Sequence, residues 1–190
     1  MRFLLFLLFL PALAVAQDRI VEPSQVIAVL NDDLDDDGIL DRAVLYYYSD
    51  WDFADLSVYH GTVQGYLEEA AYSPKIAWNG HGQGVTPYLT RNEAGSLQVM
   101  SGNESVGPSR WHETVTIAFR GGRFVVAGYT FETYELNDPD LGGLCDTNYL
   151  SGRGVLTPNS GKAENFRVPK GGIPLEEWSP ADVPPQCAAG

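Results

Sequence analysis

The sequence predicts an all-β protein, an antiparallel sheet built as a single domain over residues 17–190. Glycine and proline recur at short intervals, with 20 and 12 residues respectively, and no long segment shows the 3.6-residue apolar period of a helix. Short runs that alternate apolar and polar residues recur instead, most clearly at residues 114–119. Such runs between turn residues are typical of antiparallel strands, and we expect a sheet that resembles part of a propeller.

The first 16 residues have the features of a signal peptide. Arg2 is followed by an unbroken apolar stretch from Phe3 to Leu10, and Ala14-Val15-Ala16 is a small-x-small cleavage site. The stretch is shorter than the roughly 20 apolar residues that a membrane-spanning helix needs. We therefore expect a mature chain that begins at Gln17, has no integral membrane span after cleavage, and is periplasmic or secreted from a bacterium.

Residues 33–41 read Asp-Leu-Asp-Asp-Asp-Gly-Ile-Leu-Asp and form the clearest chemical pattern in the chain. Alternate residues of a tight loop can aim their carboxylates at one point, and Gly38 permits the sharp turn. Ca²⁺ takes six to eight oxygen ligands in a flexible shell. The predicted Ca²⁺ ligands are the carboxylates of Asp33, Asp35, Asp37 and Asp41 and the backbone carbonyl of Ile39.

Electrostatics and residue spacing limit which kind of ion site this loop can form. Two carboxylates about 4 Å apart repel by roughly 1 kcal/mol in water and about 4 kcal/mol at an effective dielectric near 20, so a compact loop favours a bound cation. The alternatives are a solvated acidic turn and Mg²⁺, which usually keeps its waters. An EF-hand needs Glu at its twelfth position, where this chain has Val44. The flanks, residues 24–30 and 43–48, are rich in β-formers, so the loop should connect two strands.

The run from Asp33 to Val44 resembles the calcium loop and following strand of FG-GAP and VCBS-type repeats, which are also blade units of integrin α-chain propellers. The resemblance covers residues 26–48. It implies that the matching carboxylates and one backbone carbonyl bind Ca²⁺ within a β-hairpin, and it implies no activity. The whole chain resembles a periplasmic or secreted bacterial protein.

Further elements follow from local patterns. Residues 114–119 and 124–131 flank Gly121-Gly122 and predict a hairpin. Residues 62–72 suggest a short helical turn. The other expected strands are residues 56–60 and 96–100 and a second hairpin of 146–150 with 155–157, and the expected loops are residues 79–84 and 137–143.

Cys145 and Cys187 are the two cysteines of the chain. In an exported protein they are expected to form a disulfide that stabilises the fold by about 4 kcal/mol and holds the proline-rich residues 180–185 against the body. Free thiols and a cysteine nucleophile are the alternatives.

The sequence offers little for catalysis. His60, His81 and His112 are far apart and show no close metal-ligand spacing, and His60 is expected to be a core histidine on an apolar strand face. No Gly-x-Ser-x-Gly motif is present. Acidic residues are so numerous that no pair stands out as a glycosidase pair.

The net charge limits the classes of partner that the protein can bind. The formal charge of −13 becomes −14 once Arg2 leaves with the signal, which disfavours nucleic acid and attracts a basic protein. We expect a non-catalytic, calcium-binding exported protein that binds another protein. It resembles periplasmic lysozyme inhibitors in its aspartate loop, so an inhibitor or immunity-like protein against a basic cell-wall hydrolase such as lysozyme is the leading interpretation. Those inhibitors often carry Ser-Gly-x-x-Tyr, which Ser101-Gly102 does not continue.

Two other classes of function stay open. One is an exported hydrolase with a structural Ca²⁺ site, which predicts a concave pocket holding a histidine or two carboxylates. The other is a carbohydrate-binding or adhesion module, for which exposed aromatic side chains would be the signal. Trp51, which follows Tyr46 to Tyr48 beside a loop, is the best surface candidate.

Overall fold

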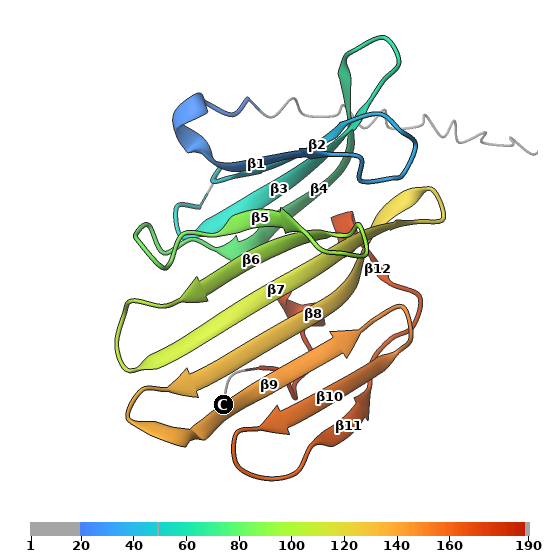
Figure 1. Cartoon of the computed structure of the whole chain (residues 1–190). Coiled ribbons are helices and arrows are strands. Elements are labelled where there is room, and N and C mark those ends of the chain that lie inside the picture. Colours follow the sequence, from blue (N-terminus) through green and yellow to red (C-terminus); the bar gives the residue numbers. More distant parts are fainter. Residues whose placement is uncertain (1–19, 49, 189–190) are drawn as a thin grey trace, which may run out of the picture.

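The computed structural model describes residues 20–48 and 50–188, and within them the fold is all-β with two antiparallel sheets (Figure 1). The first sheet has the order β1-β2-β3-β4, and its strands are β1 (Val26–Asp32), β2 (Asp41–Tyr46), β3 (Phe53–Gly61) and β4 (Leu67–Trp78). The second sheet has the order β11-β10-β9-β8-β7-β6-β5, with β12 paired to β8. Its strands are β5 (Tyr88–Arg91), β6 (Leu97–Asn103), β7 (Ser109–Arg120), β8 (Arg123–Glu135), β9 (Asp138–Asn148), β10 (Arg153–Pro158), β11 (Glu164–Arg167) and β12 (Ile173–Pro174).

The all-β, antiparallel prediction is therefore confirmed. The first sheet is a four-stranded meander, but the other described strands form one continuous sheet rather than further four-stranded units. The propeller-like arrangement stays a prediction. The signal peptide predicted for residues 1–16 lies outside the described residues.

Both predicted hairpins are present. Gly121 and Gly122 connect β7 to β8 with φ values of 62° and 80°, and a two-residue turn of type I′ requires positive φ at both positions. The second hairpin joins β9 to β10, where Arg153 pairs with Asn148. Local turn chemistry thus fixes the register of the strands on which the second sheet is built.

Two local predictions were wrong. Residues 62–72 form no helical turn: Thr62 and Tyr66 exchange hydrogen bonds across a tight turn, and β4 begins at Leu67. Residues 67–71 are mostly helix formers, yet pairing with β3 overrides their propensity. Residues 137–143 are no loop either, because the turn occupies residues 136–137 and β9 begins at Asp138.

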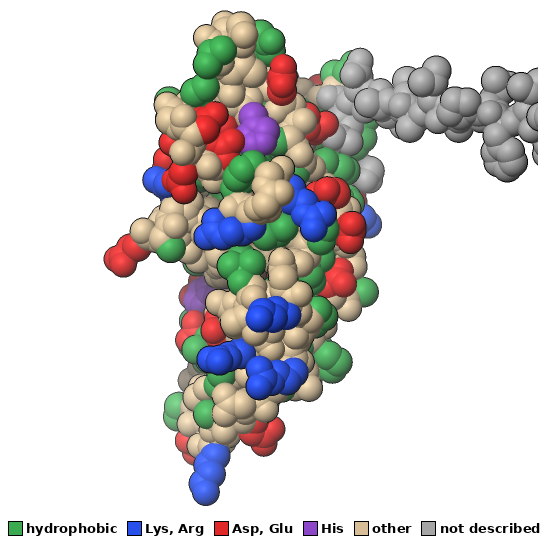
Figure 2. All heavy atoms as spheres, turned by 90° about the vertical axis from the view of Figure 1, so that its right-hand side faces the viewer, with side chains coloured by type: hydrophobic (Ala, Val, Ile, Leu, Met, Phe, Trp, Pro, Cys, Tyr) green, Lys and Arg blue, Asp and Glu red, His purple; other side chains and the backbone are tan. Residues whose placement is uncertain are grey.

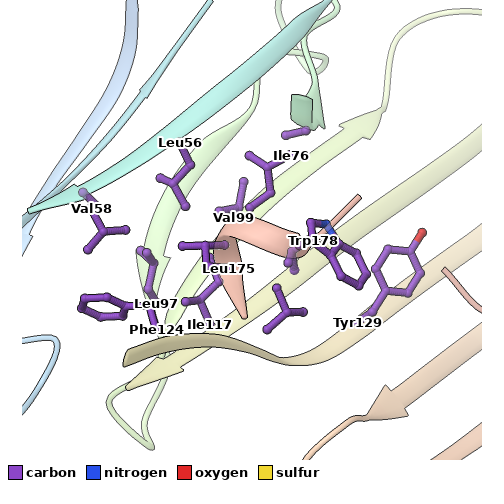
Figure 3. Close-up of a cluster of buried hydrophobic side chains, with 14 of the residues drawn as sticks. Leu56, Val58, Ile76, Leu97, Val99, Ile117, Phe124, Tyr129, Leu175 and Trp178 are labelled. Carbon is purple, nitrogen blue, oxygen red and sulfur yellow. The ribbon is translucent and has the colours of Figure 1, made fainter. Parts of the chain in front are cut away.

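The core lies between the two sheets (Figure 3). The first sheet contributes Leu56 and Val58 from β3, and the second contributes Val99, Ile117 and similar side chains. All four are almost completely buried. Aromatic and aliphatic side chains that alternate inward along each strand account for this packing.

The C-terminal segment completes the core. The 3₁₀ turn η2 (Leu175–Glu177) and its C-terminal cap place Leu175 and Trp178 in the space between the sheets (Figure 3). A second 3₁₀ turn, η3 (Pro180–Asp182), follows. The predicted Cys145–Cys187 disulfide is present and ties this segment to β9. In the described residues, no helix combines the length and the apolar character that crossing a membrane requires.

Candidate metal centre

The aspartate loop connects β1 to β2, as the spacing of the flanking strand formers predicted. The pairing of β1 with β2 runs as far as Asp32 opposite Asp41. Residues 33–40 therefore start and end at the same point of the sheet edge, and the loop must turn back on itself. Asp36 and Gly38 have φ values of 63° and 88°. Only glycine, asparagine and aspartate adopt this region readily, so the sequence suits the turn.

Three of the predicted ligands converge. One carboxylate oxygen of each of Asp33, Asp35 and Asp37 lies within 4.8 Å of the others. The cluster also organises its own backbone: Asp33 accepts hydrogen bonds from the N–H groups of Asp37 and Gly38, at 3.0 and 2.9 Å. Asp35 Oδ1 accepts from the Asp37 N–H at 3.1 Å. These bonds hold the carboxylates on the inner side of the turn.

The buried carboxylate of Asp41 holds the loop in place through hydrogen bonds to the backbone. Its side chain is 1% exposed, which is unusual for a carboxylate. Oδ2 accepts a hydrogen bond from the Leu34 N–H and Oδ1 accepts one from the Gly61 N–H, both at 2.9 Å. One carboxylate thus joins the start of the loop to the end of β3. Its remaining lone pairs are the ones available to a cation.

His60 belongs to this centre, although its sequence pattern suggested a core histidine. Nδ1 lies 2.9 Å from Asp35 Oδ2 and 3.6 Å from Asp41 Oδ1, and the three residues form a second group with ligand atoms within 4.8 Å of one another. Nδ1 is buried and does not meet either carboxylate in hydrogen-bond geometry. Asp35 is common to both groups, so the two triads share one oxygen-rich centre.

Charge crowding is visible at Asp35. Burial raises the pKa of its carboxyl above the ordinary value, and the nearby Asp41 carboxylate raises the pKa further. Both causes disfavour the ionised form in the absence of a counter-ion. A bound cation would reverse the second cause, which makes Asp35 the residue most directly coupled to occupancy of the centre.

Close packing positions the second half of the loop. A Cβ at Gly61 would lie 2.2 Å from the Leu40 carbonyl oxygen and 2.8 Å from Ile39 Cγ2. Glycine at this position therefore permits the loop to lie directly on the end of β3. The Ile39 side chain rests against Gly61, and coordination by the Ile39 carbonyl stays a prediction.

One basic side chain flanks the loop. Arg91, at the end of β5, lies 3.2 Å from Asp32 and 3.6 Å from Asp36. It reaches the outer carboxylates rather than the inner cluster of Asp33, Asp35 and Asp37. In the described residues, Arg91 forms no ion pair with the inner carboxylates.

The other two histidines lie elsewhere. His81 stacks on Trp51 with ring centroids 4.5 Å apart. His112 contacts the Glu104 carboxylate and lies 3.8 Å from Glu132. The fold therefore does not gather the three histidines into one zinc site. Trp51 is 58% exposed, as its place beside a loop suggested.

A hollow of about 650 Å³ lies between β7–β10 and the C-terminal segment. Trp111, Phe131 and Leu156 contribute apolar walls, and Glu135 is the one carboxylate among the described lining residues, which include no histidine.

Comparison with family models, with curated protein sequences and with solved structures finds no match to this chain. The resemblance of residues 26–48 to FG-GAP and VCBS-type repeats therefore rests on the aspartate spacing alone.

Sequence reasoning missed His60 for a physical reason. Its proximity to the loop depends on the pairing of β2 with β3 and on a bulge between Val58 and Tyr59. A bulge changes which side of the strand the following residues face. The available signal was the alternation of Leu56, Val58 and His60, which indicated a strand but could not place its end beside Asp35.

Proposed function

We propose that this protein binds Ca²⁺ in the β1–β2 loop and that it is an exported, non-catalytic protein whose partner is another protein. The observation that carries the proposal is the convergence of the Asp33, Asp35 and Asp37 carboxylates next to the buried Asp41. Hard oxygen donors in a flexible loop suit Ca²⁺ better than Mg²⁺, which favours a rigid octahedron and retained water. The Ile39 carbonyl is the proposed fifth protein ligand.

A second ion has a specific observation in its favour. His60 adds a nitrogen donor to Asp35 and Asp41, and imidazole with carboxylates suits Zn²⁺. The four carboxylates of the centre outnumber its one imidazole nitrogen and still favour the hard cation. The two ions are separated by calorimetric titration with Ca²⁺, Mg²⁺ and Zn²⁺ at equal ionic strength. Binding of Zn²⁺ that is lost in His60→Ala, with no heat from Ca²⁺, would contradict the calcium assignment.

The protein-binding part of the proposal rests on the surface beside the loop. Leu40, Val63 and Tyr66 are well exposed, with Val63 at 83%, and they line a hollow of about 500 Å³ together with Ile39 and Leu67. Exposed apolar side chains that cluster next to charge are typical of interaction sites. Acidic groups beside an apolar hollow suit a basic partner, and the net charge of −13 would speed the encounter.

Export and the class of partner complete the proposal. The Cys145–Cys187 disulfide supports an oxidising compartment, in keeping with the predicted signal peptide. The proposed compartment is the bacterial periplasm or exterior, and the proposed partner is a basic cell-wall hydrolase such as lysozyme.

The partner test uses purified lysozyme and the mature chain with Ca²⁺ or with chelator. Val63→Asp should weaken binding at least tenfold, because it places a charge in the apolar hollow. Val106→Asp is the matched control, since Val106 is also exposed but lies in the β6–β7 connection. If the wild-type chain neither binds nor inhibits the hydrolase, with Ca²⁺ or with chelator, the inhibitor assignment is overturned. The proposal of calcium binding would be unaffected.

A further inference from the structure

Basic side chains gather along one edge of the eight-stranded sheet. We call the basic strip the five of the chain's 12 Lys and Arg residues that share this edge and are exposed: Arg120, Arg123, Arg153, Arg167 and Lys170. Figure 2 shows Lys and Arg side chains following one another down this face, with Asp and Glu mainly at its upper end and along its margins. The net negative charge of the chain hides this local concentration.

The strip contains two like-charged pairs. Arg120 lies opposite Arg123 across the β7–β8 turn, and Arg153 lies opposite Arg167 between β10 and β11. Like charges directly opposite each other in a sheet destabilise it. Among the ion pairs of the described residues, none involves these four arginines, whereas Arg91 is paired with Asp32. Arg120 Nη1 donates to the Phe119 carbonyl oxygen at 2.6 Å, a neutral acceptor that leaves its charge uncompensated. Both arginine pairs therefore keep a positive charge that can attract a ligand.

The fold brings the pairs into one line. Lys170 packs beside Gly152 in the β9–β10 turn, with its Cβ 3.1 Å from where a Gly152 Cβ would stand. Gly172 lies against Val125 of β8 and near Leu150 in the same way. The segment that follows β11 therefore runs from the β9–β10 turn to the start of β8. Lys170 lies between the two arginine pairs as a result.

We propose that the basic strip binds a linear anionic polysaccharide through its carboxylate, sulfate or phosphate groups. A hollow of about 470 Å³ on β10 and β11 is lined by residues 153–155 and 165–167. Arg153 pairs with Arg167 and Val155 with Asn165 across the two strands, so these four side chains share one face. The planar guanidinium groups can each hold an oxyanion with two hydrogen bonds, and the Asn165 amide suits a sugar hydroxyl.

Other polyanions fit this surface less well. No exposed large hydrophobic side chain of the described chain lies within residues 119–123, 150–154 or 165–170, so the strip lacks the apolar side chains that enter a membrane interface. A duplex nucleic acid is wide and densely charged, and the acidic loop above the strip would repel it. A single sugar chain is narrow enough to contact the strip alone.

The test measures binding of polygalacturonate and of heparin to the mature chain at low and high salt. The expected affinity falls with increasing salt, because each neutralised charge releases counter-ions. The double variant Arg153→Gln/Arg167→Gln should bind at least tenfold more weakly. Lys162→Gln removes one charge in the connection between β10 and β11, at the other end of that strand pair, and should change the affinity less than twofold.

Two further measurements keep the inference falsifiable. The double variant should melt at least as high as the wild type, since it loses a like-charged pair; if it does not fold, Arg120→Gln/Arg123→Gln replaces it. Polysaccharide binding should persist in chelator, since the basic strip shares no residue with the aspartate loop. Failure of the polysaccharide inference can therefore be distinguished from failure of the calcium proposal. Unchanged binding in both double variants, no binding of either polysaccharide, or preference for duplex DNA or anionic vesicles would each overturn the inference.

Discussion

The imidazole Nδ1 of His60 lies 2.9 Å from the Oδ2 atom of Asp35, joining the end of β3 to the middle of the β1–β2 loop. Asp41 completes the connection, because it accepts hydrogen bonds from the backbone of both segments. The candidate metal centre is therefore built on the edge of a sheet rather than on a free loop. Rigid supports of this kind hold ligands more accurately than an isolated loop does.

The first prediction concerns Asp35, which both triads share. Asp35→Asn keeps an acceptor for the Asp37 N–H but removes the charge. At a Ca²⁺ concentration 100 times the dissociation constant, the wild type should gain about 2.7 kcal/mol of stability, which for this size corresponds to roughly 5–10 °C in Tm. The variant should lose most of this gain, as measured by calorimetry with Ca²⁺ and with chelator.

The matched control is Asp36→Asn. Asp36 belongs to the same loop, its side chain is 85% exposed, and asparagine tolerates its positive φ. It should therefore keep nearly the full response to Ca²⁺. Equal responses of the two variants would show that net charge alone, and not the inner cluster, is responsible.

The loop and its neighbouring strands were predictable because their signals are local. Alternating aspartates, Gly38 at a fixed offset and β-formers on both sides all act within a few residues. The contact of His60 with Asp35 was not predictable, since a bulge in the β3–β4 pairing and the β2–β3 register set it. The basic strip could not be predicted for a related reason: net charge contains no information about which side chains share a surface.

The second prediction concerns the close contact between the aspartate loop and Gly61 at the end of β3. Gly61→Ala would place a methyl group 2.2 Å from the Leu40 carbonyl oxygen, so the loop must move. Overpacking of this kind costs about 1–3 kcal/mol, and displacement of the Asp41 anchor should also weaken Ca²⁺ binding. Gly82→Ala is the control, because its Cβ would meet the Val85 side chain at 3.3 Å and the Gly80 carbonyl oxygen at 4.0 Å, an ordinary contact distance. An unchanged Ca²⁺ affinity in Gly61→Ala would show that the contact does not position the ligands.

The third prediction concerns Glu113, which faces the core from β7. Burial raises the pKa of its carboxyl above the ordinary 4.5, although hydrogen bonds from Tyr129 and Ser101 act in the opposite direction. A raised folded-state pKa stabilises the protein below the unfolded-state pKa, and this contribution is lost as pH rises through the folded-state value. Stability should therefore fall as pH rises above 4.5.

Glu113→Gln isolates this contribution, since glutamine keeps hydrogen-bonding capacity without ionising. Urea unfolding across the acidic range should show a weaker decline with rising pH in the variant than in the wild type. The exposed Glu93 in the β5–β6 turn supplies the control Glu93→Gln, which should leave the wild-type slope unchanged. A wild-type slope that persists in Glu113→Gln would assign the pH dependence to other groups.

The fourth prediction concerns the Cys145–Cys187 disulfide, which closes a loop with a sequence separation of 42 residues. According to the loop-entropy model, loss of this bond should lower the free energy of unfolding by about 4 kcal/mol. Trp178 packs against Tyr129 and Tyr149 on the segment that the bond restrains, so its fluorescence should report the loosening. Urea unfolding of the double variant Cys145→Ala/Cys187→Ala should show the loss, and reductant should shift the wild type to the same midpoint while leaving the variant unaffected. Identical midpoints for oxidised wild type and variant would mean that the packing of Leu175 and Trp178 alone holds the C-terminal segment in place.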